Sequence, residues 1–169
     1  MNTVTREADQ RSDLRRLQGK YLTFRLGPEE YGFEIKKVRE IIGMIDITRL
    51  PRTPGFVKGV VNLRGKVIPV VDLRLKFSME ERPYDEKTCI IVVEAHDASE
   101  VIPMGVIVDS VTEVLNVSPE DLEPVPDFGV EVDTGFILAM AKGRGIVRAL
   151  IDIDKVLTTD ELRELACVE

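Results

Sequence analysis

The chain has 169 residues, enough for one ordinary domain or for two small ones that share a core, and too few for a typical two-domain enzyme. Its 23 lysine and arginine residues against 30 aspartate and glutamate residues give a net charge of −7, which argues against nucleic acid or an anionic membrane surface as the main partner. With 44% hydrophobic and 31% charged residues, the composition is that of a globular protein rather than a disordered chain.

The N-terminal segment, residues 1–18, is charged and lacks the apolar stretch that a signal peptide needs. We expect a mobile tail there, with a helical turn at residues 14–17. No later stretch approaches the roughly 18 apolar residues of a membrane span. The two cysteines, Cys89 and Cys167, have no metal-binding spacing, so the sequence predicts a cytoplasmic protein that does not insert into a membrane.

Short apolar segments follow in chain order, separated by glycine, proline and charged turns. The apolar residues Leu22, Phe24 and Leu26 alternate along the chain with residues that would point to the other face of a strand. This two-residue period is typical of a strand with one buried face. Residues 31–35 repeat this pattern, and further short apolar segments lie at 45–47, 60–61, 67–71, 89–93, 104–108, 137–140 and 147–151. Many short strands without a long helical period predict an all-β protein built as small barrels or a sandwich.

Two helical segments are predicted after the strands begin. Thr158 and Glu161 form a capping box ahead of the apolar stripe Leu162, Leu165 and Ala166, which predicts a C-terminal helix at residues 158–169. A shorter helical turn is predicted at Ser118, with a proline in the first helical position.

The second half of the chain repeats the first. Gly32, Val38, Glu40 and Pro51 recur 73 residues later as Gly105, Val111, Glu113 and Pro124. Farther along the offset is 80, because the second copy has about seven extra residues near 127–134, and Gly65 and Asp72 correspond to Gly145 and Asp152. We predict a tail at 1–18, a first barrel at 19–85, a second barrel at 86–157 and a helix at 158–169, with a groove between the barrels.

Candidate catalytic groups are few. His96, the only histidine, lies in a polar stretch between two predicted strands with no nucleophile nearby, so a solvated hairpin loop is the favoured interpretation. Asp72 and Asp152 each end a predicted strand, where a capping role is favoured. The sequence therefore predicts no catalytic residue, no metal ligand and no cofactor.

One acidic motif supports an alternative. Asp133, Thr134 and Gly135 in a duplicated β-protein are reminiscent of aspartic proteases, in which two carboxylates share one proton. The matching stretch of the first repeat, residues 55–59, has no aspartate, so such a site would need a homodimer, and Asp133 lies close to the acidic Glu131. A dimeric protease is a disfavoured alternative.

Two glycine-rich turns are interpreted as β-hairpins. Residues 142–145 lie between two predicted strands, whereas a phosphate-binding loop must open a helix. Residues 62–66 form the second turn, in which Gly65 supplies a positive φ. Arg64 and Lys66 would then be exposed at a tip between rigid strands, a favourable place for recognition, and Arg64 is either a partner contact or a solvated turn residue.

Several segments together resemble the CheW family of bacterial chemotaxis coupling proteins. They are residues 31–35, 38–41, 54–73, 105–109 and 111–115, and the similarity runs from about Tyr21 to Leu157. Its most specific part is the turn Asn62, Leu63, Arg64, Gly65 with the strand that follows it.

The resemblance implies two five-stranded SH3-like β-barrels packed side by side and a scaffold without enzymatic activity. Its implied partners are the regulatory domain of the histidine kinase CheA and the cytoplasmic signalling tip of chemoreceptors. The positions that match the family's binding motif are Val38, Glu40, Gly59, Arg64 and Gly65, with Asn62 and Leu63 in the same turn. We expect a monomer in isolation, and the net charge disfavours the alternative of a nucleic-acid-binding barrel.

Overall fold

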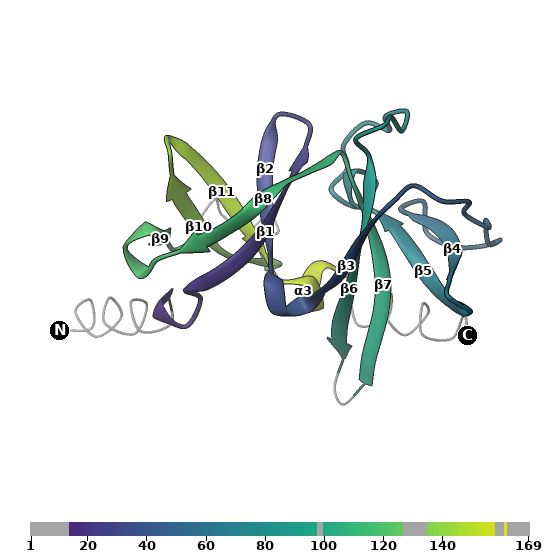
Figure 1. Ribbon diagram of the computed structural model, residues 1–169, viewed down its shortest axis with the longest axis horizontal. Coiled ribbons are helices and arrows are strands. Elements are labelled where there is room, and N and C mark those ends of the chain that lie inside the picture. The colour runs from purple at the N-terminus through teal and green to yellow at the C-terminus, as the bar shows by residue number, and fades with distance from the viewer. Residues whose placement is uncertain (1–13, 98–99, 127–134, 158–160, 162–169) are drawn as a thin grey trace.

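The computed structural model describes residues 14–97, 100–126, 135–157 and 161. These residues form two sheets that lie side by side (Figure 1). Barrel A has the strand order β8-β1-β2-β11-β10-β9, with β1 Gly19–Leu26, β2 Glu29–Glu34, β8 Ser110–Val117, β9 Leu122–Glu123, β10 Ile137–Gly143 and β11 Ile146–Ile151. Barrel B has the order β3-β6-β7-β5-β4, with β3 Val38–Gly43, β4 Val57–Leu63, β5 Lys66–Asp72, β6 Cys89–Asp97 and β7 Glu100–Val108.

Within the described residues, three short helical segments connect these strands, η1 Ile35–Lys37, α2 Leu73–Lys76 and η2 Pro119–Asp121, and α3 Ile153–Val156 follows the last strand. Segment η2 starts after Ser118, as predicted. The predicted turn at 14–17 is present, since Leu17 N donates to Leu14 O at 2.9 Å. The predicted C-terminal helix at 158–169 apart from Glu161, the tail at 1–13, and the candidates Glu131, Asp133 and Cys167 lie outside the described residues.

The two barrels exchange strands between the repeats. Strands β1 and β2 of the first repeat pair with β8 and β11 of the second, whereas β6 and β7 of the second repeat pair with β3 and β5 of the first. The predicted boundary between residues 85 and 86 therefore does not separate the barrels, and the division into 19–85 and 86–157 is corrected. Because the repeats are homologous, strands of either copy fit the same neighbours, and periodicity cannot show which copy is used.

The exchange leaves two barrels of equivalent construction. Ignoring the two-residue β9, both orders match strand for strand, with one parallel pair each, β2 with β11 and β7 with β5. The repeated glycines allow this close packing. A Cβ on Gly105 would lie 2.7 Å from Ile90 Cγ2, and one on Gly32 would lie 3.2 Å from Leu150 Cδ2. The duplication predicted from sequence is thus a structural one.

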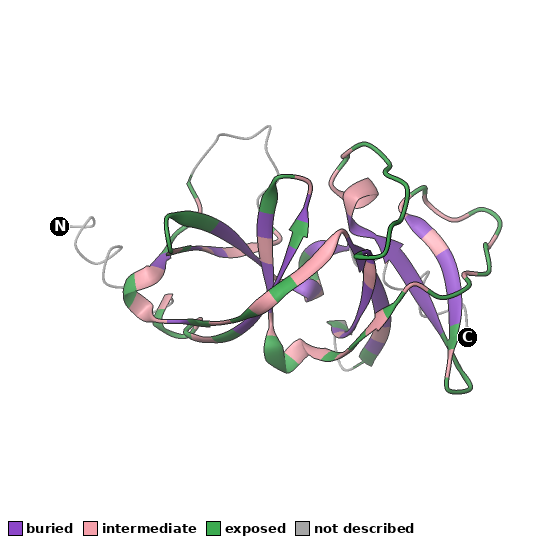
Figure 2. Ribbon diagram, turned by 45° about the horizontal axis from the view of Figure 1, so that its top comes forward, coloured by how far each residue is buried: buried purple, intermediate pink, exposed green. Residues whose placement is uncertain are grey.

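The largest hydrophobic cluster joins the two barrels. Phe24 and Phe33 of barrel A, Met104 and Val106 of barrel B, and Leu73 of α2 are fully buried in it. Figure 2 shows buried residues on the strands of both barrels. The predicted groove between the barrels is therefore filled by apolar side chains along its centre, and each barrel depends on the other for burial of its core.

Both predicted capping aspartates begin a helical turn. Asp72 Oδ1 accepts from Arg74 N, and Asp152 Oδ1 accepts from Asp154 N, each at 3.0 Å. Tyr84 also donates to Asp72 Oδ2 at 2.9 Å. Burial, together with the neighbouring Asp72 carboxylate, raises the pKa of the Tyr84 hydroxyl, so this group remains a hydrogen-bond donor.

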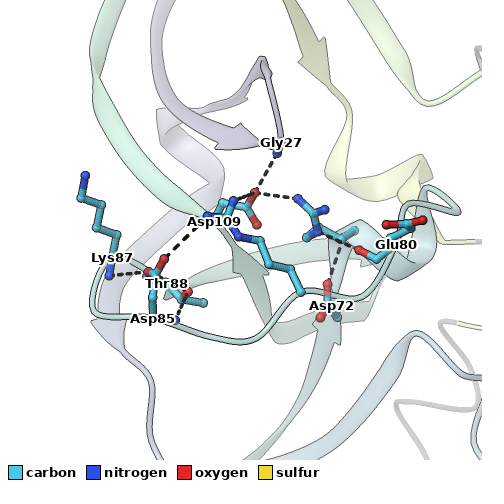
Figure 3. Close-up of polar contacts among 9 residues, drawn as sticks. Gly27, Asp72, Glu80, Asp85, Lys87, Thr88 and Asp109 are labelled. Carbon is cyan, nitrogen blue, oxygen red and sulfur yellow. Dashed lines mark hydrogen bonds and ion pairs between the residues drawn. The ribbon is translucent and has the colours of Figure 1, made fainter.

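Ion pairs hold the two places where the chain crosses between barrels. Asp109, between β7 and β8, accepts from Gly27 N and from Arg74 Nη1, both at 2.7 Å (Figure 3). At the other crossing Lys37 donates to Asp154 Oδ2 at 2.8 Å. Arg74 and Asp154 are equivalent positions of the two repeats, whereas Asp109 corresponds to Lys36 and Lys37 is the residue next to it. The two ion pairs fix the relative orientation of the barrels.

We expect Asp109→Ala and Arg74→Ala each to lower the free energy of unfolding by about 2 kcal/mol, because each leaves a mostly buried charge without its closest ionic partner; Asp109 would keep only the longer contact with Arg82 at 3.6 Å. The double variant should lose at least about 1 kcal/mol less than the sum of the two single losses. Urea unfolding measures all three, and the exposed Asp46→Ala is the control, with an expected change below about 0.5 kcal/mol. Strictly additive losses would show that the pair is not coupled.

Candidate functional site

The candidate turn is a two-residue hairpin between β4 and β5. Arg64 and Gly65 have φ values of +52° and +86°, the left-handed pair of a type I′ turn. Gly65 N donates to Asn62 Oδ1 at 2.9 Å, which closes the turn. The positive φ predicted for Gly65 is present. The left-handed conformation of Arg64 was not predicted, since arginine seldom adopts it.

Arg64 is held by a residue far away in sequence. Its guanidinium Nη2 pairs with Glu40 Oε1 on β3, and the Arg64 side chain is 73% exposed. An exposed ion pair of this kind contributes little to stability. Its effect is to orient the guanidinium while leaving its other nitrogens available for hydrogen bonds to a partner.

Gly59 on β4 permits the close approach of the Thr48 backbone behind the site. It is buried with φ +142°, and a Cβ at this position would lie 2.0 Å from Thr48 O. Thr48 and Val60 exchange two backbone hydrogen bonds of 2.8 Å, through which the chain after β3 closes barrel B against β4. Gly59 therefore acts through backbone shape, because no side chain fits beneath the Thr48 carbonyl.

The predicted residues divide into two groups. Glu40, Leu63 and Arg64 line one groove of about 460 Å³ at the open end of barrel B, and Asn62 and Gly65 are exposed in the adjoining turn. Val38 is partly buried and packs against the cluster that joins the barrels. Val38 and buried Gly59 do not line the groove.

Sequence reasoning missed part of the groove. Arg39, Ile68, Val92 and Pro103 line it together with Lys66, which the sequence predicts to be exposed at the tip of the hairpin beside Arg64. Val92 and Pro103 come from the second repeat and reach the groove only because β6 and β7 belong to barrel B. Sequence periodicity holds no signal for that placement.

The groups considered for catalysis have structural contacts. His96 is exposed near the end of β6, where its Nδ1 lies 3.0 Å from Lys37 Nζ and its backbone N donates to Asp154 Oδ1 at 2.7 Å. Burial raises the pKa of the Cys89 thiol, and a protonated thiol is a poor nucleophile. Among the described residues, no three His, Cys, Asp or Glu side chains gather as metal ligands would, and no helix is long and apolar enough to span a membrane.

Comparison with known proteins identifies the family. The family model of the CheW-like domain matches residues 20–161. The chain belongs to the CheW family. It is 40% identical over 142 residues to the chemotaxis protein CheW of Klebsiella aerogenes, which covers 84% of this chain and 83% of that protein. It is 34% identical over 145 residues to the chemotaxis protein CheW of Rhizobium meliloti, with 86% and 90% covered.

A solved structure supports the same assignment. The scaffolding protein TtCheW from Thermoanaerobacter tengcongensis superposes with a TM-score of 0.74 at 33% identity, covering 85% of this chain and 95% of that one. The predicted family and the fold class of two SH3-like barrels are confirmed. The CheW-family protein is thus a chemotaxis coupling scaffold, and neither the nucleic-acid-binding barrel nor the aspartic protease is supported.

Proposed function

We propose that this protein links chemoreceptors to the histidine kinase CheA as a non-enzymatic scaffold, in the cytoplasm at receptor arrays beside the inner membrane. The observation that carries the proposal is the rigid hairpin of barrel B, where Glu40 orients an exposed Arg64 beside an open groove, in a chain of the CheW family. Turnover of ATP, peptide or phosphoester substrates that a point substitution abolishes would contradict the non-enzymatic part.

The proposed contact surface comprises the exposed turn and the groove beside it. Glu40, Asn62, Leu63, Arg64 and Gly65 contact the kinase regulatory domain or the receptor signalling tip. Val38 contributes at the seam between the barrels, and Gly59 holds the backbone in shape. The protein is a monomer in isolation. Because ion pairs and a shared core hold the two barrels together, the surface that they offer to both partners changes little on binding.

We expect Arg64→Ala to leave the melting temperature nearly unchanged, because its ion pair is exposed. It should weaken partner binding by about 1–3 kcal/mol, roughly 5- to 150-fold, because an interfacial arginine anchors a partner through several hydrogen bonds. Thermal unfolding is measured together with titration of the kinase regulatory domain and of a receptor-tip fragment.

Arg144→Ala is the matched control. Arg144 occupies the equivalent turn of barrel A with φ +53°, pairs with Glu113 and is also 73% exposed. It should neither melt the protein nor weaken binding. If Arg64→Ala melts the protein while the folded fraction binds both partners normally, Arg64 is structural and the site assignment is wrong.

A further inference from the structure

The residues that line the groove of barrel B can be compared with the residues at equivalent positions of barrel A. The repeat offset makes Ile68 of β5 equivalent to Arg148 of β11, and Pro103 of β7 equivalent to Glu30 of β2. Val92 of β6 and Thr23 of β1 are equivalent because they pair with the repeated Gly105 and Gly32. The same three places of the fold are therefore apolar in barrel B, where barrel A has two charged residues and a threonine.

Barrel A fills this place with its own polar side chains. Arg148 Nε lies 2.9 Å from Glu30 Oε2, and the two side chains are only 4% and 8% exposed. Arg148 Nη1 also donates to Gly143 O at 3.3 Å, and buried Thr23 donates to Glu113 O at 2.8 Å. A carboxylate and a guanidinium from the same chain thus form a buried ion pair inside barrel A, although neither Glu30 Oε2 nor Arg148 Nε makes a hydrogen bond within the described residues.

Barrel B leaves the equivalent place open. Ile68 and Val92 form an apolar floor with Leu63 and Pro103, and none of these side chains has a charged group that could close the groove above it. The result is the groove of about 460 Å³.

The rim of this groove is mainly cationic. Arg39, Arg64 and Lys66 lie around it, with Glu40 as the one acidic lining residue among those described. Arg39 pairs with Glu94 at 2.7 Å, and Arg64 uses a single nitrogen for Glu40. Lys66 has no ion-pair partner within the part of the chain that the structure describes. On a chain of net charge −7, such a rim favours an anionic group.

We propose that this groove receives an acidic segment of a protein partner, which places an apolar side chain on the Ile68 and Val92 floor and carboxylates against Arg64 and Lys66. The inference rests on the proposed scaffold function and adds the chemistry of the segment that the site recognises.

The test measures binding of the kinase regulatory domain and of a receptor-tip fragment to the full chain at low and high salt. Lys66→Glu should weaken binding of the partner that uses the groove by about tenfold at low salt, with a smaller salt dependence than the unaltered protein shows. The matched control Arg144→Glu reverses an exposed hairpin cation of barrel A and should bind normally. Methyl NMR signals of Ile68 and Val92 should shift on binding, while that of Leu150 in barrel A should not.

Three results would overturn the inference. If Lys66→Glu binds both partners as the unaltered protein does, without salt dependence, the acidic-segment proposal fails and the scaffold function stands. If Arg144→Glu weakens binding as much as Lys66→Glu, the effect is one of net charge and not of the groove. If the unaltered protein binds neither partner, the proposed function fails and this inference fails with it.

Discussion

Residues 19–85 expressed alone are expected to stay largely unfolded. In the full chain β1 and β2 pair with β8 and β11, and β3 and β5 pair with β6 and β7. The fragment keeps only the hairpins β1–β2 and β4–β5, and β1, β2, β3 and β5 each lose a neighbouring strand. It also loses the second-repeat half of the main core, including Met104 and Ile151. Without those contacts the entropy cost of ordering the chain is not offset.

Amide hydrogen exchange measures this outcome directly. The lone fragment should exchange rapidly at β1 to β5, which are expected to be protected in the full chain. Co-expression of 19–85 with 86–169 is the matched control, because the two pieces together contain every strand and should regain slow exchange. Protection in the lone fragment equal to that in the full chain would contradict the exchanged topology.

Gly59→Ala is expected to lower the free energy of unfolding by about 3 kcal/mol or more, because its Cβ would lie 2.0 Å from Thr48 O and the backbone would have to move. That movement would break the hydrogen bonds between Thr48 and Val60 that close barrel B. Partner binding should be lost along with the closed end of the barrel, and urea unfolding measures the stability.

Gly65→Ala separates steric clash from backbone strain. Gly65 also has a positive φ, +86°, but nothing lies within 4 Å of the position that its Cβ would take. Its cost should be limited to the conformational penalty of about 1–2 kcal/mol. If Gly59→Ala unfolds at the same urea concentration as the unaltered protein and still loses its partners, Gly59 is a contact residue and the steric explanation is wrong.

Several local features of this protein could be predicted from its sequence. The hairpin at 62–66, the capping roles of Asp72 and Asp152 and most strands follow from residue types within a few positions of one another. Local chemistry decides such features, because glycine permits a positive φ and an aspartate at a strand end accepts from the next backbone N–H. The repeat offset likewise predicted two equivalent barrels.

Two local predictions failed for identifiable reasons. The apolar segment at 45–47 forms no strand and leads only to the single bridge at Thr48. Strands β3 and β8 were not predicted, because their inward positions are mostly only partly buried and include the glutamates Glu40 and Glu113. An edge strand beside an open barrel end needs no strong apolar alternation.

Only the tertiary structure decided which strands share a barrel and which side chains meet. Glu40 meets Arg64, Asp109 meets Arg74, and Val92 joins the groove beside the hairpin because β6 and β7 cross into the barrel of the other repeat. The amino-acid sequence by itself determined most of the strands, the hairpin turns, the duplication and the family, all of which depend on nearby residues or on similarity along the chain. Strand pairing between homologous repeats depends on which arrangement buries the shared core and satisfies the charges at the crossings, and that is a property of the whole folded chain.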